Sequence, residues 1–356
     1  PSLTCSWSCS LAHHEAGGHV RPMGTLLEAL DDEAARTGFS GVVRVDRGGA
    51  PDVAAAYGFA DRAHAAAMTP DHQLGTASLT KGFTALTVMS LVADGALALS
   101  TSARSVLGSD LPLIDDEVTL EHLLSHTSGI GDYLDESALE SADDYVMPVP
   151  VHRLATSDDY LAILDGHPMV SAPGSAFTYN NGAYVVLAVI AERVAGAPFA
   201  DLVAERVWAP AGMASTAFLR TDELPGTAAV GYLHAEGLRT NALHLPVRGS
   251  GDGGAYTTAG DLSAFWEALT AGRIVAEPWV AEMLVPRHAP SDGELGCGLG
   301  VWLHASGVLE LHGYDAGVSI RSMHDPASRT TWTAASNTSS GSYPLERVLL
   351  ADLPRR

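Results

Sequence analysis

A serine and a lysine stand three positions apart at the start of a segment with helical spacing. Ser78 and Lys81 open the segment 78–94, in which apolar residues recur every three or four positions. That spacing places both side chains on one helix face, one turn apart. A serine hydroxyl becomes nucleophilic when a neighbouring base takes its proton, and a lysine can be that base where desolvation favours its neutral form. The helix N-terminus adds N–H groups and partial positive charge where an oxyanion would form. The pair therefore predicts catalysis by Ser78 as nucleophile, with Lys81 as its base.

The composition of the chain singles out the same lysine. Of the 20 lysine and arginine residues in the 356-residue sequence, Lys81 is the only lysine. Arginine replaces lysine well as a surface charge, but its guanidinium stays protonated and cannot accept a proton. Position 81 is thus a candidate for proton chemistry, and chance retention of one lysine is the plain alternative.

A tyrosine and an asparagine lie just before a strongly apolar segment. Tyr179 and Asn181 are predicted to lie on a loop that leads into a buried helix over 182–196. A tyrosine there can relay a proton to a leaving group, and the Asn181 amide can bind either Lys81 or a substrate amide. Taken alone, both are ordinary loop residues.

A glycine-containing segment near the C-terminus offers backbone groups. The segment 309–319 is predicted as a strand, and its Gly313 and Gly317 would let a ligand approach the backbone closely. A backbone N–H of this strand could act as a second oxyanion donor opposite that of Ser78.

The elements that must position these groups run in the order strands, helices, strands. Because edge strands need partners, we expect the early and late strands to share one antiparallel sheet, with a mostly helical lobe packed against it, an α+β fold. The predicted lobes are a discontinuous sheet lobe, 23–72 with 256–356, and a helical lobe, 73–255, with the active site in the groove between them. Strands are expected at 40–48, 52–58, 297–304, 308–312, 316–323 and 329–336, and helices at 25–36, 78–94, 119–125, 157–165, 182–196, 199–207, 259–270 and from about residue 343.

The first 22 residues lack the apolar stretch of a signal peptide. Because Met23 is followed by a predicted helix, we expect residues 1–22 to be a non-native or flexible leader. The protein is then expected to be cytoplasmic, with export still open if this leader is not native. No stretch of about eighteen apolar residues occurs, so no membrane span is expected. A net charge of −22 repels phosphate backbones, so nucleic acid is not an expected partner.

Other motifs support neither a metal nor a cofactor. His14 and His19 are five residues apart across a glycine pair, whereas a zinc-protease helix needs histidines four apart. The glycines of 249–254 match G-x-G-x-x-G but follow no long apolar strand. Cys297 is expected to be a small buried hydrophobe. His126 is expected to anchor its own turn rather than to pair with a serine.

Four stretches of the chain together carry a resemblance to a known family: SGVVRVDRGG with AAYGFADR, LGTASLTKGFTALTVMSLVADGAL, LEHLLSHTSGI and PGSAFTYNNGAYVVLAVIAERVAG. From about Phe39 to about Asn337 the sequence resembles the family of serine β-lactamases, DD-peptidases and class C-like esterases, and GGAYTTAGDLSAFWEAL and CGLGVW fit that family's later helix and strand. The resemblance implies a covalent acyl-enzyme on Ser78, with Lys81 as base and Tyr179 as proton relay.

The sequence departs from the family in its third motif, Lys/His-x-Gly on a strand. The spacing to Gly317 favours Leu311-His312-Gly313, with Leu at the cationic position, over the register that begins at His312 and continues through Tyr314. His312, Gly313 and Tyr314, with Asn181, are the candidate substrate-binding residues.

An uncharged third motif favours an esterase, amidase or acyltransferase whose substrate is a small ester, amide or β-lactam. The alternatives are a true β-lactamase or D-alanyl-D-alanine carboxypeptidase and, in another class, a non-catalytic penicillin-binding sensor. The sequence predicts neither the oligomeric state nor the acyl donor and acceptor.

Overall fold

Strands from both ends of the chain form one sheet. The computed structural model describes residues 25–134, 139, 141–288 and 295–353. Within these residues the main sheet has seven antiparallel strands in the order β2-β1-β11-β10-β9-β8-β7. They are β1 (Gly41–Arg47), β2 (Ala50–Tyr57), β7 (Leu295–Cys297), β8 (Trp302–His304), β9 (Leu309–Asp315), β10 (Val318–Asp325) and β11 (Thr330–Ser336). The pairing of β1 with β11 confirms that early and late strands share a sheet, and the fold class is α+β as predicted.

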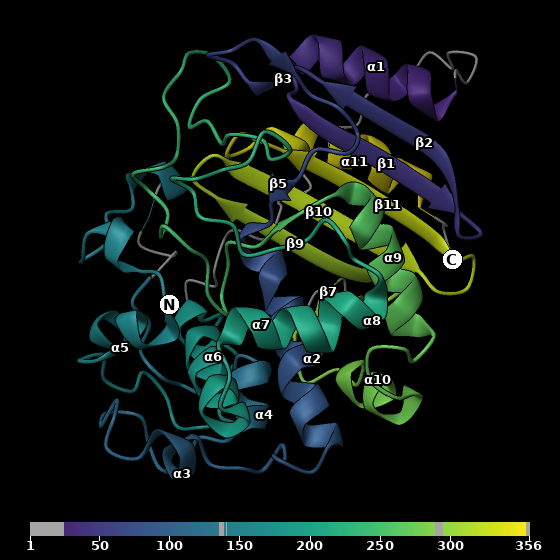
Figure 1. Cartoon of the computed structure of the whole chain (residues 1–356). Coiled ribbons are helices and arrows are strands. Elements are labelled where there is room, and N and C mark those ends of the chain that lie inside the picture. The colour runs from purple at the N-terminus through teal and green to yellow at the C-terminus, as the bar shows by residue number, and fades with distance from the viewer. Residues whose placement is uncertain (1–24, 135–138, 140, 289–294, 354–356) are drawn as a thin grey trace, which may run out of the picture.

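Helices cover both faces of this sheet (Figure 1). α1 (Leu26–Thr37) and α11 (Ser342–Asp352) pack together on one face, and α9 (Ala259–Thr270) lies against the other. Most of the remaining helices lie within the segment 73–255: η1 (Ala77–Leu79), α2 (Thr80–Ala93), α3 (Ala103–Leu107), α4 (Leu120–Leu124), η3 (Ala142–Asp144), η4 (Val151–Arg153), α5 (Ser157–Leu164), α6 (Asn181–Ala195), α7 (Phe199–Val203), the π-helical η5 (Ala204–Trp208) and α8 (Ala209–Ala211). The short helix α10 (Glu277–Met283) follows α9. Two short strand pairs, β3 (Phe59–Asp61) with β4 (Ala66–Ala67) and β5 (Leu74–Gly75) with β6 (Tyr256–Thr257), complete the described chain.

The two faces of the sheet bury separate hydrophobic cores. Successive side chains of a strand point to opposite faces. In β1, Val43 and Val45 join a cluster with Leu345 of α11, whereas Val42 joins the larger cluster of the helical lobe. The first cluster contains residues from both the N-terminal and the C-terminal part of the chain. The sheet lobe is therefore stable only when these two parts pack against each other.

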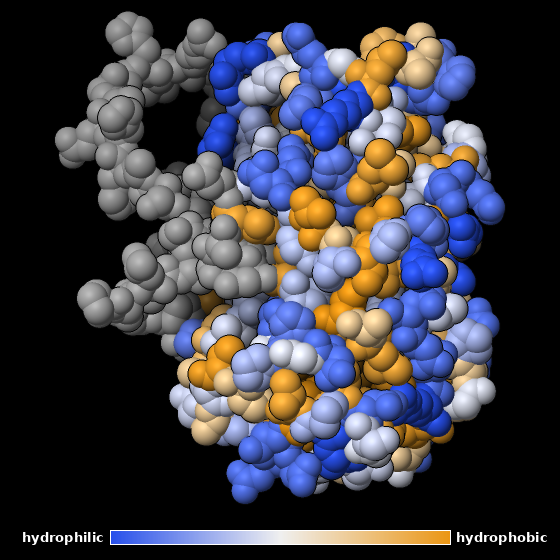
Figure 2. All heavy atoms as spheres, turned by 90° about the vertical axis from the view of Figure 1, so that its left-hand side faces the viewer, coloured by the Kyte–Doolittle hydropathy of each residue, from blue (hydrophilic) through white to orange (hydrophobic). Residues whose placement is uncertain are grey.

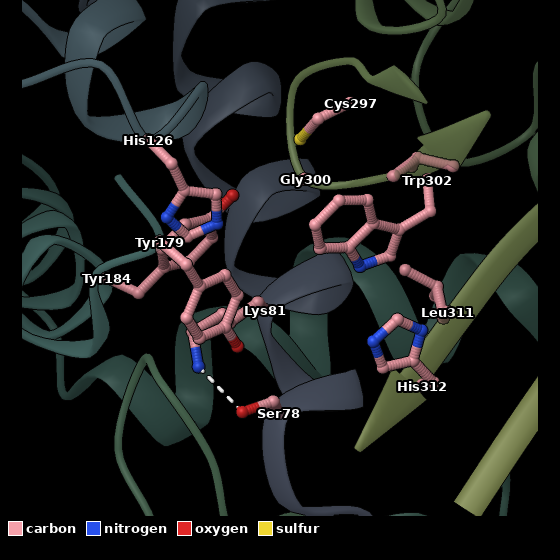
Figure 3. A pocket seen from close by; sticks show the side chains of 11 residues that line it. Ser78, Lys81, His126, Tyr179, Tyr184, Cys297, Gly300, Trp302, Leu311 and His312 are labelled. Atoms are coloured by element: carbon pink, nitrogen blue, oxygen red, sulfur yellow. Dashed lines mark hydrogen bonds between the residues drawn. The ribbon is translucent and has the colours of Figure 1, made fainter. Parts of the chain in front are cut away.

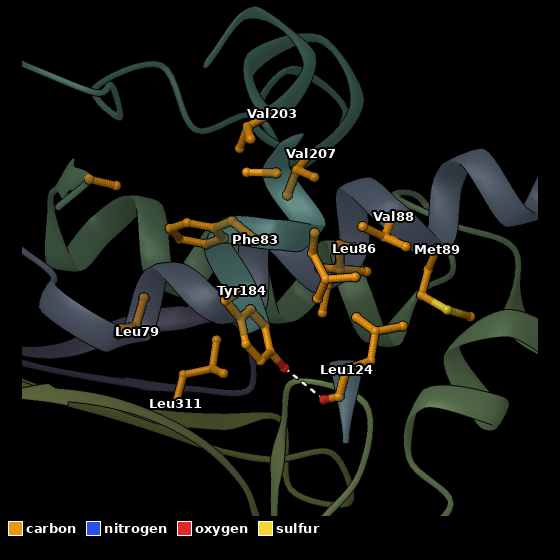
Figure 4. Packing of buried hydrophobic residues seen from close by; sticks show 14 of the residues in the cluster. Leu79, Phe83, Leu86, Val88, Met89, Leu124, Tyr184, Val203, Val207 and Leu311 are labelled. Carbon is orange, nitrogen blue, oxygen red and sulfur yellow. Dashed lines mark hydrogen bonds between the residues drawn. The ribbon is translucent and has the colours of Figure 1, made fainter. Parts of the chain in front are cut away.

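α2 forms the centre of the helical lobe and is buried from Thr80 to Val92. A helix that is apolar on all sides needs neighbours on all sides. Figure 4 shows Phe83 of α2 in this packing. Its ring lies edge-on to the rings of Trp208 and Phe265, with 5.9 and 5.2 Å between centroids. The hydroxyl of Thr84 donates to the carbonyl of Gly251 at 2.6 Å, which satisfies a buried polar group. This packing fixes the helix that carries the Ser-Lys pair.

The structure corrects two predicted strands. The strand expected at 297–304 is interrupted between β7 and β8, where Gly300 has a φ of +76°. The segment 309–319, treated as one strand in the search for oxyanion donors, is a hairpin, because Gly317, with a φ of +68°, makes the turn between β9 and β10. Gly317 is therefore required by the turn. The separate strands expected at 308–312 and 316–323 correspond to β9 and β10.

The surface is mixed in character. On the face shown in Figure 2, apolar side chains form an interrupted band among polar and charged ones. No single described helix is long and apolar enough to cross a membrane, while the bent pair Asn181–Ala195 and Phe199–Ala211 passes that test by length and composition alone. The prediction for residues 1–22, including His14 and His19, falls outside the described residues. The division into two lobes at the stated boundaries stays a prediction.

A buried histidine on β10 makes stability depend on pH. His324 stacks on Trp266 of α9 at 5.8 Å between centroids, and its Nδ1 lies 2.9 Å from the Thr331 hydroxyl. Burial lowers the pKa of His324 to about 4, from 6.5. Between these two pH values the unfolded chain binds a proton that the folded chain does not, so each pH unit of acidification costs about 1.4 kcal/mol of stability.

We therefore expect the stability advantage of the wild type over His324→Gln to fall by about 2 kcal/mol between pH 7 and pH 5. Urea unfolding of both proteins at the two pH values measures this difference. An advantage that is the same at both pH values would contradict a buried, neutral His324.

Candidate active site

Ser78 and Lys81 meet at the N-terminus of the central helix. Lys81 Nζ lies 2.9 Å from Ser78 Oγ, and the lysine is only 4% exposed (Figure 3). Ala77, just before the nucleophile, has a φ of +43°, a region that L-residues seldom adopt. Strain of this kind persists only where the surrounding structure imposes it, often at functional sites. The predicted pairing of Ser78 with Lys81 is thus present in the structure.

Two further oxygens surround the lysine amine. The side-chain oxygen of Asn181 lies 2.8 Å from Lys81 Nζ, and the backbone oxygen of Asp252 lies 2.7 Å from it. Both are carbonyl oxygens, which can only accept hydrogen bonds. Of the two roles predicted for Asn181, the structure favours contact with Lys81. A neutral amine has two N–H groups and one lone pair, so donation to these carbonyls leaves the lone pair for the Ser78 hydroxyl.

The N-terminus of α6 is anchored so that Asn181 reaches the lysine. Asn180 caps the helix, with its side-chain oxygen accepting from Ala183 N at 2.6 Å. The partly buried carboxyl of Asp132 accepts from the backbone N–H groups of Asn181 and Gly182 at 2.6 and 2.9 Å. Burial raises the pKa of Asp132 to about 6, although these hydrogen bonds favour its ionised form. The sequence carries no local signal for Asp132, because this residue lies about fifty positions before the helix that it binds.

Asp252 places a second carboxyl behind Lys81. Its side chain accepts a hydrogen bond from the hydroxyl of Tyr133 at 2.5 Å. Burial raises the pKa of the Asp252 carboxyl, and the charge of Lys81 and the Tyr133 hydroxyl act in the opposite direction. Asp252 has no local signal either, because it lies within the glycine-rich segment 249–254, whose only pattern is the weak G-x-G-x-x-G match.

Tyr179 is oriented by a buried histidine. Its ring stacks on His126 with centroids 4.5 Å apart, and Lys81 Nζ lies 5.0 Å from the centre of the Tyr179 ring. His126 Nδ1 accepts from the backbone N–H of Asn180 at 3.1 Å. Burial lowers the pKa of His126 to about 3, with the charge of Lys81 acting in the same direction, so the ring is uncharged at neutral pH. His126 therefore supports Tyr179 in addition to its own turn.

The third motif lies on β9, directly beside the nucleophile. A Cβ at Gly313 would fall 2.1 Å from the Thr76 carbonyl oxygen and 2.8 Å from Ser78 N, so only glycine fits there. Leu311 packs against Gly82 of α2, whose Cβ, if present, would lie 2.7 Å from a Leu311 methyl group. These contacts favour the Leu311-His312-Gly313 register, so an apolar side chain takes the position next to the nucleophile helix.

A small cavity of about 20 Å³ joins these groups. His312 and Trp302 form one wall and Tyr179 the opposite wall (Figure 3). The Tyr314 ring, predicted to contact substrate, instead stacks on Tyr343 of α11 at 5.9 Å and is absent from the lining among the described residues. The full lining is Ser78, Lys81, His126, Tyr179, Tyr184, Cys297, Gly300, Val301, Trp302, Leu311 and His312.

Cys297 is buried, as predicted. Burial raises the pKa of its thiol to about 12, so it is a protonated residue of the cavity wall and not a nucleophile.

In the part of the chain that the structure describes, no three His, Cys, Asp or Glu side chains group as metal ligands would. Trp302 ends the CGLGVW stretch of the family resemblance, but nothing in the sequence indicated that its side chain lines the site, since an aromatic residue on a strand is usually a packing residue.

Comparison with known proteins gives consistent results. The chain matches the Beta-lactamase family model over residues 25–353. It is 27% identical over 304 residues to a protein named as the penicillin-binding protein PbpX of Bacillus subtilis, covering 84% of this chain and 71% of that protein. It is 35% identical over 217 residues to esterase EstB of Burkholderia gladioli, covering 59% of this chain and 55% of the esterase.

A solved structure supports the same assignment. The crystal structure of a penicillin-binding protein from Bacillus halodurans is 33% identical and superposes with a TM-score of 0.85, covering 91% of this chain and 100% of that one. The family match spans nearly all the described residues. The chain therefore belongs to the Beta-lactamase family.

Proposed function

We propose that the protein is a serine hydrolase that forms an acyl-enzyme on Ser78 and cleaves small esters and amides. The observation that carries the proposal is the position of Lys81 Nζ, 2.9 Å from Ser78 Oγ and within hydrogen-bond distance of two carbonyl oxygens. A nucleophile and its base need this distance, and the base needs a third group that orients it. Here Asn181 and the backbone of Asp252 orient the amine.

Acylation begins with proton transfer from Ser78 to Lys81. The Ser78 oxygen forms a bond to the acyl carbon, and the carbonyl oxygen becomes an oxyanion. Ser78 N lies at the N-terminus of η1, and the backbone of β9 at Gly313 passes directly beside it. Backbone N–H groups of these two segments are the proposed donors to the oxyanion. The bond to the leaving group then breaks, and the acyl group remains on Ser78.

The leaving group needs a proton, more so when it is an amine than an alcohol. Tyr179 is the proposed relay, since its ring lies beside Lys81 Nζ and is stacked on the uncharged His126. A tyrosine hydroxyl can both accept and donate, so it can pass the proton from the lysine to the leaving atom.

The proposed substrate class follows from Leu311. This side chain is 3% exposed, packs against Gly82 of α2 and, in the favoured register of the third motif, takes the place of the family's cation. A buried leucine cannot attract a substrate carboxylate, which favours uncharged esters and amides over β-lactams. The similarity to a protein named as an esterase supports the same substrate class.

A β-lactamase, a D-alanyl-D-alanine carboxypeptidase and a non-catalytic sensor remain the alternatives. The first two would act best on substrates that carry a carboxylate. A sensor would acylate at Ser78 and not turn over, so a labelled and stable adduct without product release distinguishes it from a hydrolase.

For the nucleophile, we expect Ser78→Ala to lose at least about a thousandfold in kcat/KM for p-nitrophenyl esters, because the acyl-enzyme can no longer form. Intact-mass spectrometry after a fluorophosphonate should show one adduct, mapped to Ser78, in the wild type and none in the variant. An adduct on another residue, or normal turnover by the variant, would disprove the assignment.

For the substrate class, we expect kcat/KM for p-nitrophenyl butyrate to exceed that for nitrocefin when both are measured on one preparation. The reason is the uncharged Leu311 in the third motif. If nitrocefin is hydrolysed tenfold faster, a difference of about 1.4 kcal/mol in barrier, the protein is a β-lactamase instead.

A further inference from the structure

A buried carboxylate lies behind the cavity wall and binds two histidines. Glu310 of β9 is 1% exposed, and its two oxygens lie 2.8 Å from His304 Nε2 and 2.6 Å from His312 Nδ1. Arg321 of β10 pairs with the same carboxylate at 3.3 Å and with Glu346 of α11 at 3.4 Å. Burial alone would raise the pKa of Glu310, but the two histidines and Arg321 outweigh it and hold the pKa well below its usual range.

The ionised carboxylate decides which nitrogen of His312 carries a proton. A carboxylate only accepts hydrogen bonds, so Nδ1 must be the donor, and the neutral ring then has its lone pair on Nε2. The His312 ring is also fixed by stacking on Trp302, with centroids 5.4 Å apart and planes 12° from parallel. Figure 3 shows Nε2 on the side of the ring that faces Ser78 and Tyr179. An oriented imidazole therefore faces the nucleophile from the wall opposite Tyr179.

The space in front of this nitrogen matches one small molecule. A cavity must provide roughly 10–15 Å³ to admit a water, and the cavity lined by Ser78, Trp302 and His312 provides about 20 Å³. A water needs two or more polar partners. The indole nitrogen of Trp302 points into the same space as His312 Nε2, so a donor and an acceptor are both available there (Figure 3).

We propose that His312, oriented by Glu310, is the general base that activates water to release the acyl group, a step that rests on the acyl-enzyme proposed above. His312 Nε2 takes a proton from the water as its oxygen forms a bond to the acyl carbon. The bond from that carbon to Ser78 Oγ then breaks, and the proton passes from His312 to Ser78 Oγ. Ester plus water thus becomes carboxylic acid plus free serine. His312 is a catalytic residue in this step, and Glu310 is a positioning residue.

Separate measurement of the acylation and deacylation rates distinguishes a general base from a substrate-binding residue. Stopped-flow hydrolysis of p-nitrophenyl acetate gives acylation as a burst and deacylation as the steady rate. We expect His312→Gln to keep the burst rate within about threefold and to lose about a hundredfold in the steady rate, as removal of a general base does. The acetyl adduct on Ser78 should then accumulate in the intact-mass spectrum of the variant.

His64 provides a matched control. Its Nδ1 also lies 2.6 Å from a carboxylate, that of Asp61, but its side chain is exposed at the surface. We expect His64→Gln to leave both phases unchanged. Glu310→Gln should slow deacylation alone and displace the acid limb of its pH profile. The acid side of the profile depends on the charged and titratable groups packed around His312, which are Glu310, His304, Arg321 and Glu346. Added imidazole should accelerate deacylation of acetylated His312→Ala and not of the wild type.

A His312→Gln variant that deacylates at the wild-type rate would overturn the proposal, as would equal losses in both phases, which indicate a binding or structural role. If His312→Gln does not fold, imidazole rescue of His312→Ala and the pH profile of Glu310→Gln distinguish a general base from a binding or structural residue in the same way. A wild type with no adduct on Ser78 would instead overturn the proposed acyl-enzyme, and the same spectra report it.

Discussion

Lys81 Nζ is buried among three oxygen atoms, and the positions of these oxygens fix three parts of the chain relative to one another. Ser78 comes from the start of the central helix, Asn181 from the start of α6, and the backbone of Asp252 from the loop before β6. An amine taken out of water without acceptors costs several kcal/mol, so these contacts must all be made together. The buried packing of α2 and α6 keeps them in register.

A second constraint acts from the side of the sheet. β9 runs so close to the nucleophile that Gly313 and Gly82 have no room for a side chain. This close approach places the backbone of the strand at the expected oxyanion and the Leu311 side chain against the helix. The next residue, His312, faces the cavity from the same strand. One strand thus contributes the backbone, the apolar contact and the imidazole.

Sequence analysis predicted most elements and the central pair because these depend on local spacing. The Ser78–Lys81 pair, the loop before α6 and the shared sheet are all visible as periodicity and order along the chain. The partners that orient this pair are not visible in that way. Asp132, Asp252 and Glu310 act through contacts between residues distant in sequence, and a single acidic residue in a loop or strand has no local signature. The structure directs the Tyr314 ring toward Tyr343 of α11, a contact between distant residues that no local pattern reveals, and its contact with substrate stays a prediction.

Whether Lys81 accepts the proton of Ser78 is tested most directly by the rate at which a fluorophosphonate modifies Ser78 in Lys81→Arg and Lys81→Ala. Arginine keeps the positive charge but cannot accept a proton. Both variants should react at least about a thousandfold more slowly than the wild type, and at rates within about threefold of each other. A Lys81→Arg protein that reacts within about tenfold of the wild type would show that the site needs only a positive charge, and would contradict the assignment of Lys81 as base.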